Sequence, residues 1–254
     1  MKNAYSEIET ANRYDSARSL PAQTQTLWLD ALKSSIPKQE IRKILDLGCG
    51  TGRFTTGLGK IFECSVIGLE PSSAMLNVAL SQNEPNVEWK QGQAESIPLE
   101  NETVDLVFMS QVLHHLAEPQ EALREIKRVL TAAGYLAIRN GIREHNKELE
   151  WLRFFPEALE IEEKRMSSQQ ELTELVSGQS FELISRRTIY QLFADSYDEY
   201  FDKISRRGLS ALIAISDKSF QSGLEQFQKW VSQQPRNLLV YEPVDLFVFQ
   251  KKSV

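Results

Sequence analysis

Residues 44–52 read ILDLGCGTG, and this stretch decides the fold of the chain. A short apolar run ends next to an acidic residue, Asp46, and glycine then occupies every second position from Gly48 to Gly52. The pattern predicts a buried strand that turns sharply into a helix, with a bare backbone that a ligand can approach. The next apolar run ends in Glu70, where a carboxylate can hold a sugar diol. Together these residues indicate a nucleoside-cofactor site.

Apolar runs alternate with amphipathic stretches on both sides of this loop. Strands separated by single helices predict right-handed crossovers and a parallel sheet. Helices are expected at residues 24–34, 53–61, 71–80 and 119–130, and strands at 43–47, 65–69, 87–91, 104–109 and 135–139. Residues 132–134, which end in Gly134, are expected to turn the chain from the last of these helices into the last of these strands.

The pattern changes after Asn140. Further helices are predicted at residues 142–155, 168–177 and 197–234, and an extended segment rich in β-branched and aromatic residues at 181–193. The final strand, 244–250, follows Pro243. Because proline lacks a backbone N–H, this strand is expected at a sheet edge or as a late addition to the sheet.

Composition limits the classes of protein to consider. With 254 residues, the chain is long enough for one large α/β domain or a domain with a modest lid. Its net charge of −6 disfavours a general nucleic-acid binder. No apolar stretch approaches the roughly 20 residues that span a bilayer, and residues 1–7 lack the apolar core of a signal peptide. Cys49 and Cys64 stand in no metal or redox spacing, so we expect no metal site and a cytoplasmic location.

Two other glycine-rich loops fit the sequence poorly. A dinucleotide-binding loop, G-x-G-x-x-G, would need a third glycine where Arg53 stands. A phosphate-binding loop that starts at Gly52 and continues to Gly57 would need a lysine where Leu58 stands. Both alternatives are therefore weak.

The remaining form, Asp46-x-Gly48-x-Gly50-x-Gly52, resembles motif I of the class I S-adenosylmethionine-dependent methyltransferases. The resemblance covers roughly residues 40–140. The segment 68–72, with Glu70 at its centre, resembles motif II of this family, in which the acid accepts hydrogen bonds from both ribose hydroxyls.

Two later segments extend the resemblance. Residues 92–99 look like the adenine loop of the family, although Gln93 stands where members commonly carry aspartate, and the backbone of Ala94 would meet the ring edge. Residues 104–116 resemble motif IV and its downstream loop, in which Ser110 would lie beside the methionine part of the cofactor. The segment 14–19 resembles a flap that approaches the same part of the cofactor, with a solvated leader helix as an equally good interpretation.

The resemblance implies a fold, a cofactor and a set of ligands. The fold would be a Rossmann-like, seven-stranded, mostly parallel α/β sheet with helices on both faces and a helical lid. Residues 1–254 would form a single domain, with a cofactor-binding core at 36–141 and lid insertions at 142–180 and 195–236. The implied residues that bind S-adenosylmethionine, and its product S-adenosylhomocysteine, are Tyr14, Arg18, Asp46, Gly48, Cys49, Gly50, Thr51, Glu70, Pro71, Met75, Gln93, Ala94, Glu95, Ser110 and Gln111.

The implied activity is methyl transfer to O, N or C of a small organic molecule. A sulfonium methyl is already activated, so positioning is the main requirement and a base serves only weakly acidic acceptors. His114 and His115 are weak candidates for that base, and packing or capping is the alternative role. Aromatic residues concentrated between 151 and 230 suit an apolar or aromatic acceptor pocket, with core packing as the stronger alternative.

Two other functions remain open on sequence alone. The chain could bind S-adenosylmethionine without transferring a methyl group. It could also methylate RNA or protein, which its acidic charge disfavours. One subclass of such enzymes carries an Asn/Asp-Pro-Pro-aromatic signature, and Ser110-Gln111-Val112-Leu113 stands at that place. We therefore expect a small-molecule substrate and neither a nucleic-acid nor a membrane partner.

Overall fold

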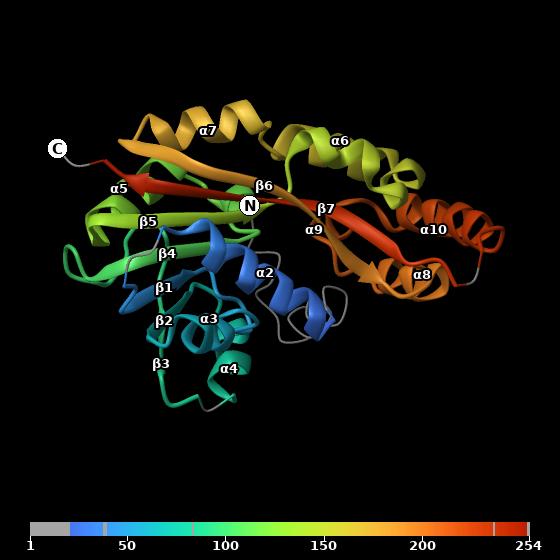
Figure 1. Cartoon of the computed structure of the whole chain (residues 1–254). Helices are drawn as coiled ribbons and strands as arrows, with labels where there is room; N and C mark the ends of the chain where they lie inside the picture. Colours follow the sequence, from blue (N-terminus) through green and yellow to red (C-terminus); the bar gives the residue numbers. More distant parts are fainter. Residues whose placement is uncertain (1–20, 38–39, 83, 236, 253–254) are drawn as a thin grey trace.

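The fold is built on one seven-stranded sheet with the order β3-β2-β1-β4-β5-β7-β6 (Figure 1). The computed structural model describes residues 21–37, 40–82, 84–235 and 237–252. The first five strands are parallel, and β7 runs antiparallel to both of its neighbours. The strands are β1 (Lys43–Leu47), β2 (Ser65–Glu70), β3 (Val87–Gln91), β4 (Val104–Ser110), β5 (Leu130–Asn140), β6 (Phe181–Ala194) and β7 (Val240–Lys251). The expected Rossmann-like sheet is confirmed.

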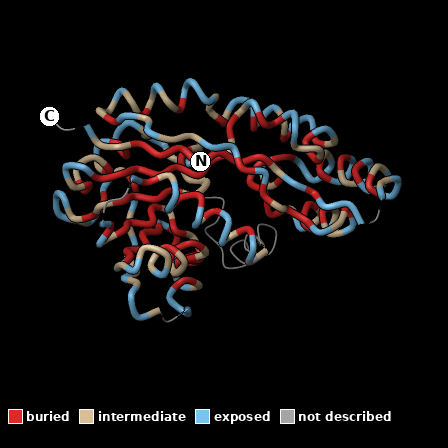
Figure 2. Tube along the Cα trace, viewed as in Figure 1, coloured by how far each residue is buried: buried red, intermediate tan, exposed pale blue. Residues whose placement is uncertain are grey.

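Helices cover both faces of this sheet. Strand residues alternate between the two faces, so Leu45 and Val107 belong to one core cluster while Ile44 and Leu106 belong to the other. The first cluster packs α5 (Pro119–Val129) and α7 (Gln169–Ser177) onto the sheet, and the second packs α2 (Ala22–Ser35) and α3 (Thr55–Phe62). Figure 2 shows the result, with buried central strands and helices that are exposed on their outer sides.

The strand order places a ligand site at one edge of the sheet. From β1 the chain first builds outward to β2 and β3, and then returns to the other side of β1 with β4. In an open parallel sheet, ligands bind at the carboxyl ends of the strands where the order reverses. This switch point brings together the residues that follow Leu47 of β1, Glu70 of β2 and Ser110 of β4.

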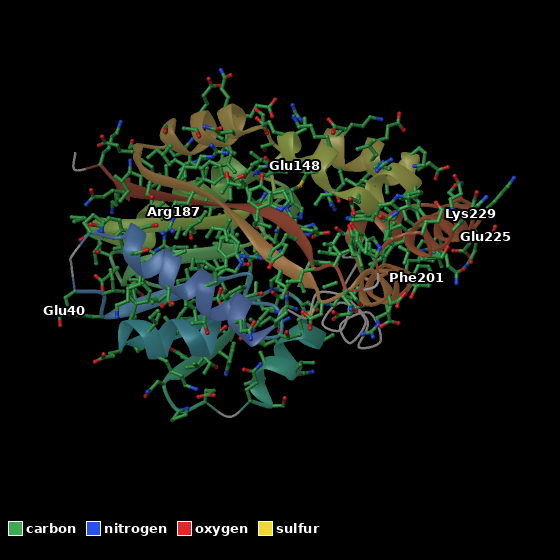
Figure 3. All side chains as sticks on the ribbon, turned by 45° about the vertical axis from the view of Figure 1, so that its right-hand side comes forward. Glu40, Glu148, Arg187, Phe201, Glu225 and Lys229 are labelled. Carbon is green, nitrogen blue, oxygen red and sulfur yellow. The ribbon has the colours of Figure 1, made fainter. Side chains whose placement is uncertain are left out.

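Beyond β5 the chain forms a second, helical layer at one end of the sheet (Figure 1). It has its own core of apolar side chains, including Phe155, Tyr200 and Phe227. Its outer face is charged, and residues such as Glu225 and Lys229 project from α10 into solvent (Figure 3). The elements are the 3-10 helices η2 (Arg143–Glu148) and η3 (Glu150–Phe154), and the helices α6 (Pro156–Arg165), α8 (Tyr197–Ser205), α9 (Ser210–Ala214) and α10 (Asp217–Val231).

The sequence predicted this helical layer only in outline. The predicted helix 142–155 is wrong, because the structure has two short 3-10 helices there, and α6 begins only at Pro156. A proline is favoured at the first helical position because its missing N–H is not needed there. The predicted helix 197–234 is three separate helices, α8, α9 and α10.

The expected turn at residues 132–134 is also wrong. Strand β5 already begins at Leu130, and its pairing with β4 jumps from Leu130 to Tyr135, so the residues between them form a bulge. Gly134 does not adopt a positive φ. A Cβ at this position would lie 2.9 Å from Cδ2 of Leu130, so close packing rather than backbone freedom requires glycine here.

The last strand does not lie at a sheet edge, and of the two expected positions the late addition to the sheet is the one observed. β7 is inserted between β5 and β6, and β6 forms the edge. The pairing of β7 with β5 ends at Asp245, whereas its pairing with β6 continues past Pro243 to Val240. Pro243 therefore lies where β7 has a partner strand on one side only, and this is how an interior strand accommodates a proline.

The helices are short. The longest in the part of the chain that the structure describes is α10, with 15 residues. None of the described helices has the length and the continuous apolar character that crossing a bilayer would demand.

The helical layer predicts a specific loss of stability. Phe227 is fully buried in its core and lies 5.3 Å from the ring of Tyr200. Replacing Phe227 by alanine should lower the free energy of unfolding by about 3–5 kcal/mol, because a large cavity is left behind. Urea unfolding followed by circular dichroism measures this change. Leu80→Ala, at the half-exposed end of α4 (Ser73–Leu80), is the control and should cost less than about 1 kcal/mol; equal losses would contradict the packing described here.

Candidate cofactor and acceptor site

The glycine loop after β1 has a backbone that other residues adopt only with strain. Gly48, Gly50 and Gly52 have φ angles of 72°, 59° and 84°, all in the left-handed region. Gly48 and Gly52 are also crowded, since a Cβ would lie 2.5 Å from Cγ2 of Val112 and 2.6 Å from Cη2 of Trp89, respectively. A Cβ on Gly50 would have no neighbour within 4 Å. The middle of the loop therefore faces open space, as a ligand-binding backbone requires.

Glu70 ties this loop to the end of β2. Gly50 N donates to Oε2 of Glu70 at 3.0 Å, and Ser72 N donates to Oε1 at 2.9 Å. The side chain is 8% exposed. Burial raises the pKa of Glu70, and these two backbone hydrogen bonds oppose the rise. Each carboxylate oxygen keeps a second lone-pair direction, so Glu70 can still accept two hydroxyl hydrogen bonds.

Asp46 holds the other side of the loop. Its Oδ2 accepts a hydrogen bond of 2.6 Å from Oγ1 of Thr55, the first residue of α3. Burial raises the pKa of Asp46 to about 7, although the Thr55 hydroxyl works in the opposite direction. Asp46 therefore fixes the angle between β1 and α3, a positioning role that the sequence motif alone did not reveal.

Trp89 is part of the site and was not predicted. It lies opposite Gly68 in the register of β2 and β3, and a Cβ on Gly68 would lie 2.5 Å from its ring. The same ring lies against Gly52. Trp89 therefore supports the glycine loop from the side of the sheet. The sequence signal was a glycine in the predicted strand 65–69 combined with a tryptophan in the next strand.

The predicted adenine loop is held by α5. Ile97 N donates to Oε2 of Glu125 at 2.9 Å, and Nη2 of Arg128 donates to the Ile97 carbonyl at 2.9 Å. Within this loop Ala94 is buried and Gln93 is exposed. The loop therefore has a fixed shape before any ligand binds.

The other predicted cofactor residues lie around these loops. Cys49 and Thr51 are buried in the glycine loop, and Met75 is buried at the first turns of α4. Pro71 is exposed beside Glu70, and Glu95 is half-buried in the adenine loop. Burial raises the pKa of the Cys49 thiol, so this side chain is a packing group and not a nucleophile. Tyr14 and Arg18 fall outside the described residues.

A buried arginine stands behind the end of β4. Arg139 of β5 is 4% exposed, and its Nη1 donates to Oγ of Ser110 at 3.0 Å. Its Nη2 donates to Oε1 of Gln191 on β6 at 2.5 Å, and Nε1 of Trp28 on α2 donates to the same oxygen at 3.0 Å. The guanidinium also lies 4.4 Å from the ring centroid of Trp28. A charged residue that ends an apolar strand was the available sequence signal for Arg139.

The two histidines after β4 have different surroundings. His114 is half-buried, lines the cavity described next, and its Nδ1 lies 3.2 Å from Oδ1 of Asn140. Asn140 donates through its Nδ2 to the Gly141 carbonyl, so its Oδ1 is the atom that accepts from His114. His115 is exposed and does not belong to the cavity wall formed by the described residues.

A cavity of about 100 Å³ opens between the end of β4, the end of β5 and the helical layer. It adjoins the glycine loop through Arg53, and it joins the predicted methionine end of the cofactor site through Ser110 and Gln111. Polar and apolar side chains line it in similar numbers: Arg53, Ser110, Gln111, His114, Arg139, His145, Asn146, Glu162, Arg165, Gln191 and Glu242, with Gly141, Ile142, Leu149, Trp151, Met166, Phe193, Leu209, Pro243 and Val244.

His145 was also missed by sequence reasoning. Its Nε2 lies 2.7 Å from Oδ2 of the fully buried Asp245, and its Nδ1 lies 2.9 Å from Oε1 of Glu148. Burial lowers the pKa of His145, but the two carboxylates outweigh this and raise it above the ordinary value. With both ring nitrogens engaged, His145 fastens η2 to β7 and is not placed to act as a base.

Most of the aromatic residues expected around an acceptor serve the core instead. Of that set, only Trp151 and Phe193 line the cavity. The others pack in or against the core of the helical layer or, like Tyr190, lie on the surface. The members of the set are Trp151, Phe154, Phe155, Tyr190, Phe193, Tyr197, Tyr200, Phe201, Phe220, Phe227 and Trp230.

Comparison with known proteins finds similarity to methyltransferases. Residues 45–138 match the family model described as a methyltransferase domain. This segment is thus similar to the class I S-adenosylmethionine-dependent methyltransferases. An uncharacterized methyltransferase of Schizosaccharomyces pombe is 37% identical over 133 residues, which are 52% of this chain and 51% of that protein. The chain covers about half or less of the length of the curated methyltransferases that it matches, from 36% to 51% for three of them.

Solved structures share the fold over most of this chain. A protein from an antibiotic biosynthesis pathway of Anabaena variabilis has a TM-score of 0.71 and 19% identity, covering 91% of this chain and 100% of its own. The [4+2]-cyclase SpnF has a TM-score of 0.65 and 17% identity, covering 94% and 84%. At these identities the likeness concerns the fold.

The buried Asp46 predicts a pH-dependent stability. An unfolded aspartate titrates near pH 3.9, whereas Asp46 titrates at about 7 in the folded chain. Between these values the folded state binds more protons, so stability falls as pH rises, by at most about 1.4 kcal/mol per unit. Asp46→Asn removes this dependence.

Urea unfolding at pH 5 and pH 7 measures the effect. From pH 5 to pH 7, the free energy of unfolding of the original chain should fall by about 2 kcal/mol more than that of Asp46→Asn. Asp30→Asn, on the exposed face of α2, is the matched control. A difference between the original chain and Asp46→Asn that stays constant with pH would contradict the buried, protonated carboxyl.

Proposed function

We propose that this chain transfers a methyl group from S-adenosylmethionine to a small organic acceptor. The observation that carries the proposal is the glycine loop. Its left-handed backbone is hydrogen-bonded to Glu70, and through Arg53 it adjoins a separate cavity that Ser110 also lines. A nucleoside cofactor and a second reactant could thus meet at one sheet edge. When bound, the cofactor supplies a sulfonium methyl; its carbon bonds to a lone pair of the acceptor while the carbon–sulfur electron pair stays on sulfur.

The proposed cofactor ligands follow the loops. Glu70 would accept the ribose hydroxyls, the backbone at Ala94 and the side chain of Gln93 would meet the adenine, and Ser110 would lie beside the methionine part. The open space over Gly50 supports this placement. Residues 36–141 would form the cofactor-binding core, and 142–180 and 195–236 would form the lid over the acceptor. A reducing cytoplasm suits the two unpaired cysteines, Cys49 and Cys64.

His114 is the better candidate for a general base of the two neighbouring histidines. Its hydrogen bond to Asn140 places the proton on Nδ1, so Nε2 is the nitrogen that would receive a proton from the acceptor. Its position in the cavity wall supports this role. Asn140 would then be a positioning residue that fixes the tautomer.

A second candidate function keeps the cofactor site without methyl transfer. The shared fold with the cyclase SpnF favours keeping this alternative. Methylation of RNA or protein is less well supported, because the net charge is −6 and the cavity is small. Labelled methyl transfer from S-adenosylmethionine to a panel of small acids, phenols, enols and amines separates these functions.

Cofactor binding provides the first test. Calorimetry should show about micromolar affinity for S-adenosylhomocysteine, and Glu70→Ala should weaken it at least tenfold because the ribose loses its acceptor. Glu88→Ala, an exposed carboxylate paired with Lys90 on the adjacent strand β3, is the matched control and should leave the affinity unchanged. No binding of either S-adenosylmethionine or S-adenosylhomocysteine to the folded chain would refute the proposed function.

The two histidines provide the second test. With any acceptor of the panel that is methylated, His114→Gln should lower kcat by about 100-fold, whereas His115→Gln should leave kcat nearly unchanged. The pH dependence of kcat distinguishes a base from a packing group, because its acidic limb should disappear in His114→Gln. Equal effects of the two substitutions would remove His114 from this role.

A further inference from the structure

One wall of the cavity consists of neutral side chains whose oxygens already accept hydrogen bonds from the protein. Oγ of Ser110 accepts from Arg139 at 3.0 Å. Oε1 of Gln191 accepts from Arg139 at 2.5 Å and from Trp28 at 3.0 Å. Oε1 of Gln111 accepts from the backbone N–H of Gly141 at 3.3 Å. All three side chains line the same cavity.

The occupied acceptors decide what these side chains offer to a ligand. A hydroxyl that accepts a hydrogen bond still has its own hydrogen to donate, and an amide that turns its oxygen toward a protein donor turns its NH₂ group away. None of the described residues accepts a hydrogen bond from the Ser110 hydroxyl or from Nε2 of Gln111 or Gln191. We call these three side chains the donor wall.

The backbone holds one member of the donor wall in a strained conformation. Gln111 has a φ of 60°, in the left-handed region, although it is not glycine. Its backbone N–H donates to the Arg139 carbonyl at 2.7 Å, which fixes this conformation. Strain of this kind is typical of sites where a side chain must be aimed.

The positive charge of Arg139 strengthens the hydrogen bonds that the donor wall can donate to a ligand. Its guanidinium donates directly to Ser110 and Gln191 from a position that is 4% exposed. A charged donor polarises the groups that it binds, and it strengthens the hydrogen bonds that those groups donate in turn. Two carboxylates lie elsewhere in the cavity wall. Glu162 is paired with Arg165 at 2.5 Å, so its charge is largely offset, and Glu242 accepts a hydrogen bond from the Tyr200 hydroxyl at 3.4 Å.

We propose that the donor wall binds an oxyanion of the acceptor, so that the substrate is a small carboxylate or phenolate and not an amine. This proposal rests on the proposed methyl transfer. An oxyanion has several lone pairs for the three donors, whereas an ammonium group placed against the donor wall would meet these donors and the positive charge of Arg139. Gln111 is thereby assigned to the acceptor and not to the cofactor. In place of the expected apolar or aromatic pocket, the acceptor would occupy one that has both apolar side chains, such as Trp151 and Phe193, and polar ones.

Three probes of similar size test the charge preference. Ligand-observed NMR titrations at pH 8 compare benzoate, 4-nitrophenolate and benzylammonium on the chain loaded with S-adenosylhomocysteine. At least one of the two oxyanions should bind at least tenfold more tightly than benzylammonium, and the tighter of the two tells carboxylate from phenolate. Equal or tighter binding of benzylammonium, or binding of none of the three, would overturn the proposal.

Two substitutions test the donor wall itself. Ser110→Ala removes the hydroxyl, and Gln111→Glu replaces the donor by a carboxylate of the same shape; each should weaken oxyanion binding at least tenfold. Gln233→Glu adds the same charge at an exposed position after α10 and is the control. Unchanged oxyanion affinity in both variants, or loss of S-adenosylhomocysteine affinity in Gln111→Glu, would overturn the assignment.

The same measurements separate this proposal from the proposed function. If the unmodified chain does not bind S-adenosylhomocysteine in calorimetry, the proposed cofactor site is refuted but the donor wall is not. The three probes are therefore also titrated without S-adenosylhomocysteine, where a preference for oxyanions that is lost in Ser110→Ala and Gln111→Glu would still support the donor wall.

Discussion

The hydrogen bond from Gly50 N to Glu70 is the interaction on which the rest of the site depends. It joins the loops that follow β1 and β2, and it requires Gly50 to hold a φ of 59°. A second bond, from Ser72 N, ties Glu70 to the residue that caps the start of α4. One partly desolvated carboxylate therefore fixes the glycine loop and the beginning of a helix while it keeps lone pairs for a ligand. In the same way, Asp46 joins β1 to the start of α3 by accepting a hydrogen bond from Thr55.

The first half of the chain could be predicted closely because its signals are local. The strands 43–47 and 87–91 were predicted to the residue. The first is a short, mostly apolar run that is buried in the sheet, whereas the second lies at the sheet edge and mixes apolar with polar side chains. The loops around Glu70 and Ser110 follow from the same pattern. The second half depends on contacts distant in sequence: Pro243 did not reveal that β7 would be inserted beside β5, because that depends on which strand arrives last.

The acceptor side of the site shows the same limit. Trp151 and Phe227 both belong to the core of the helical layer, yet of the two Trp151 alone also lines the cavity, and nothing in the sequence distinguishes them. Gln191 has no motif, and its importance comes from Arg139 and Trp28, which approach it from β5 and α2. Polar groups that are distant in sequence and meet only in the tertiary structure cannot be predicted from the spacing of residues along the chain. The residues proposed to bind the cofactor could be predicted, because the backbone conformations that they adopt, such as the positive φ of Gly50, leave a pattern in a short segment of sequence.

Strand β7 runs through all three cores of the molecule. Val240 belongs to the core of the helical layer, Val244 to the α2 and α3 side of the sheet, and Phe247 to the α5 and α7 side. The helical layer is thus joined to the sheet by a continuous paired strand. A slip of one residue in its register would exchange the faces of Val244 and Asp245, bury a valine against His145 and push a carboxylate into an apolar cluster. Because Pro243 and Val244 of β7 line the cavity, the register of β7 between β5 and β6 also sets the shape of the cavity wall.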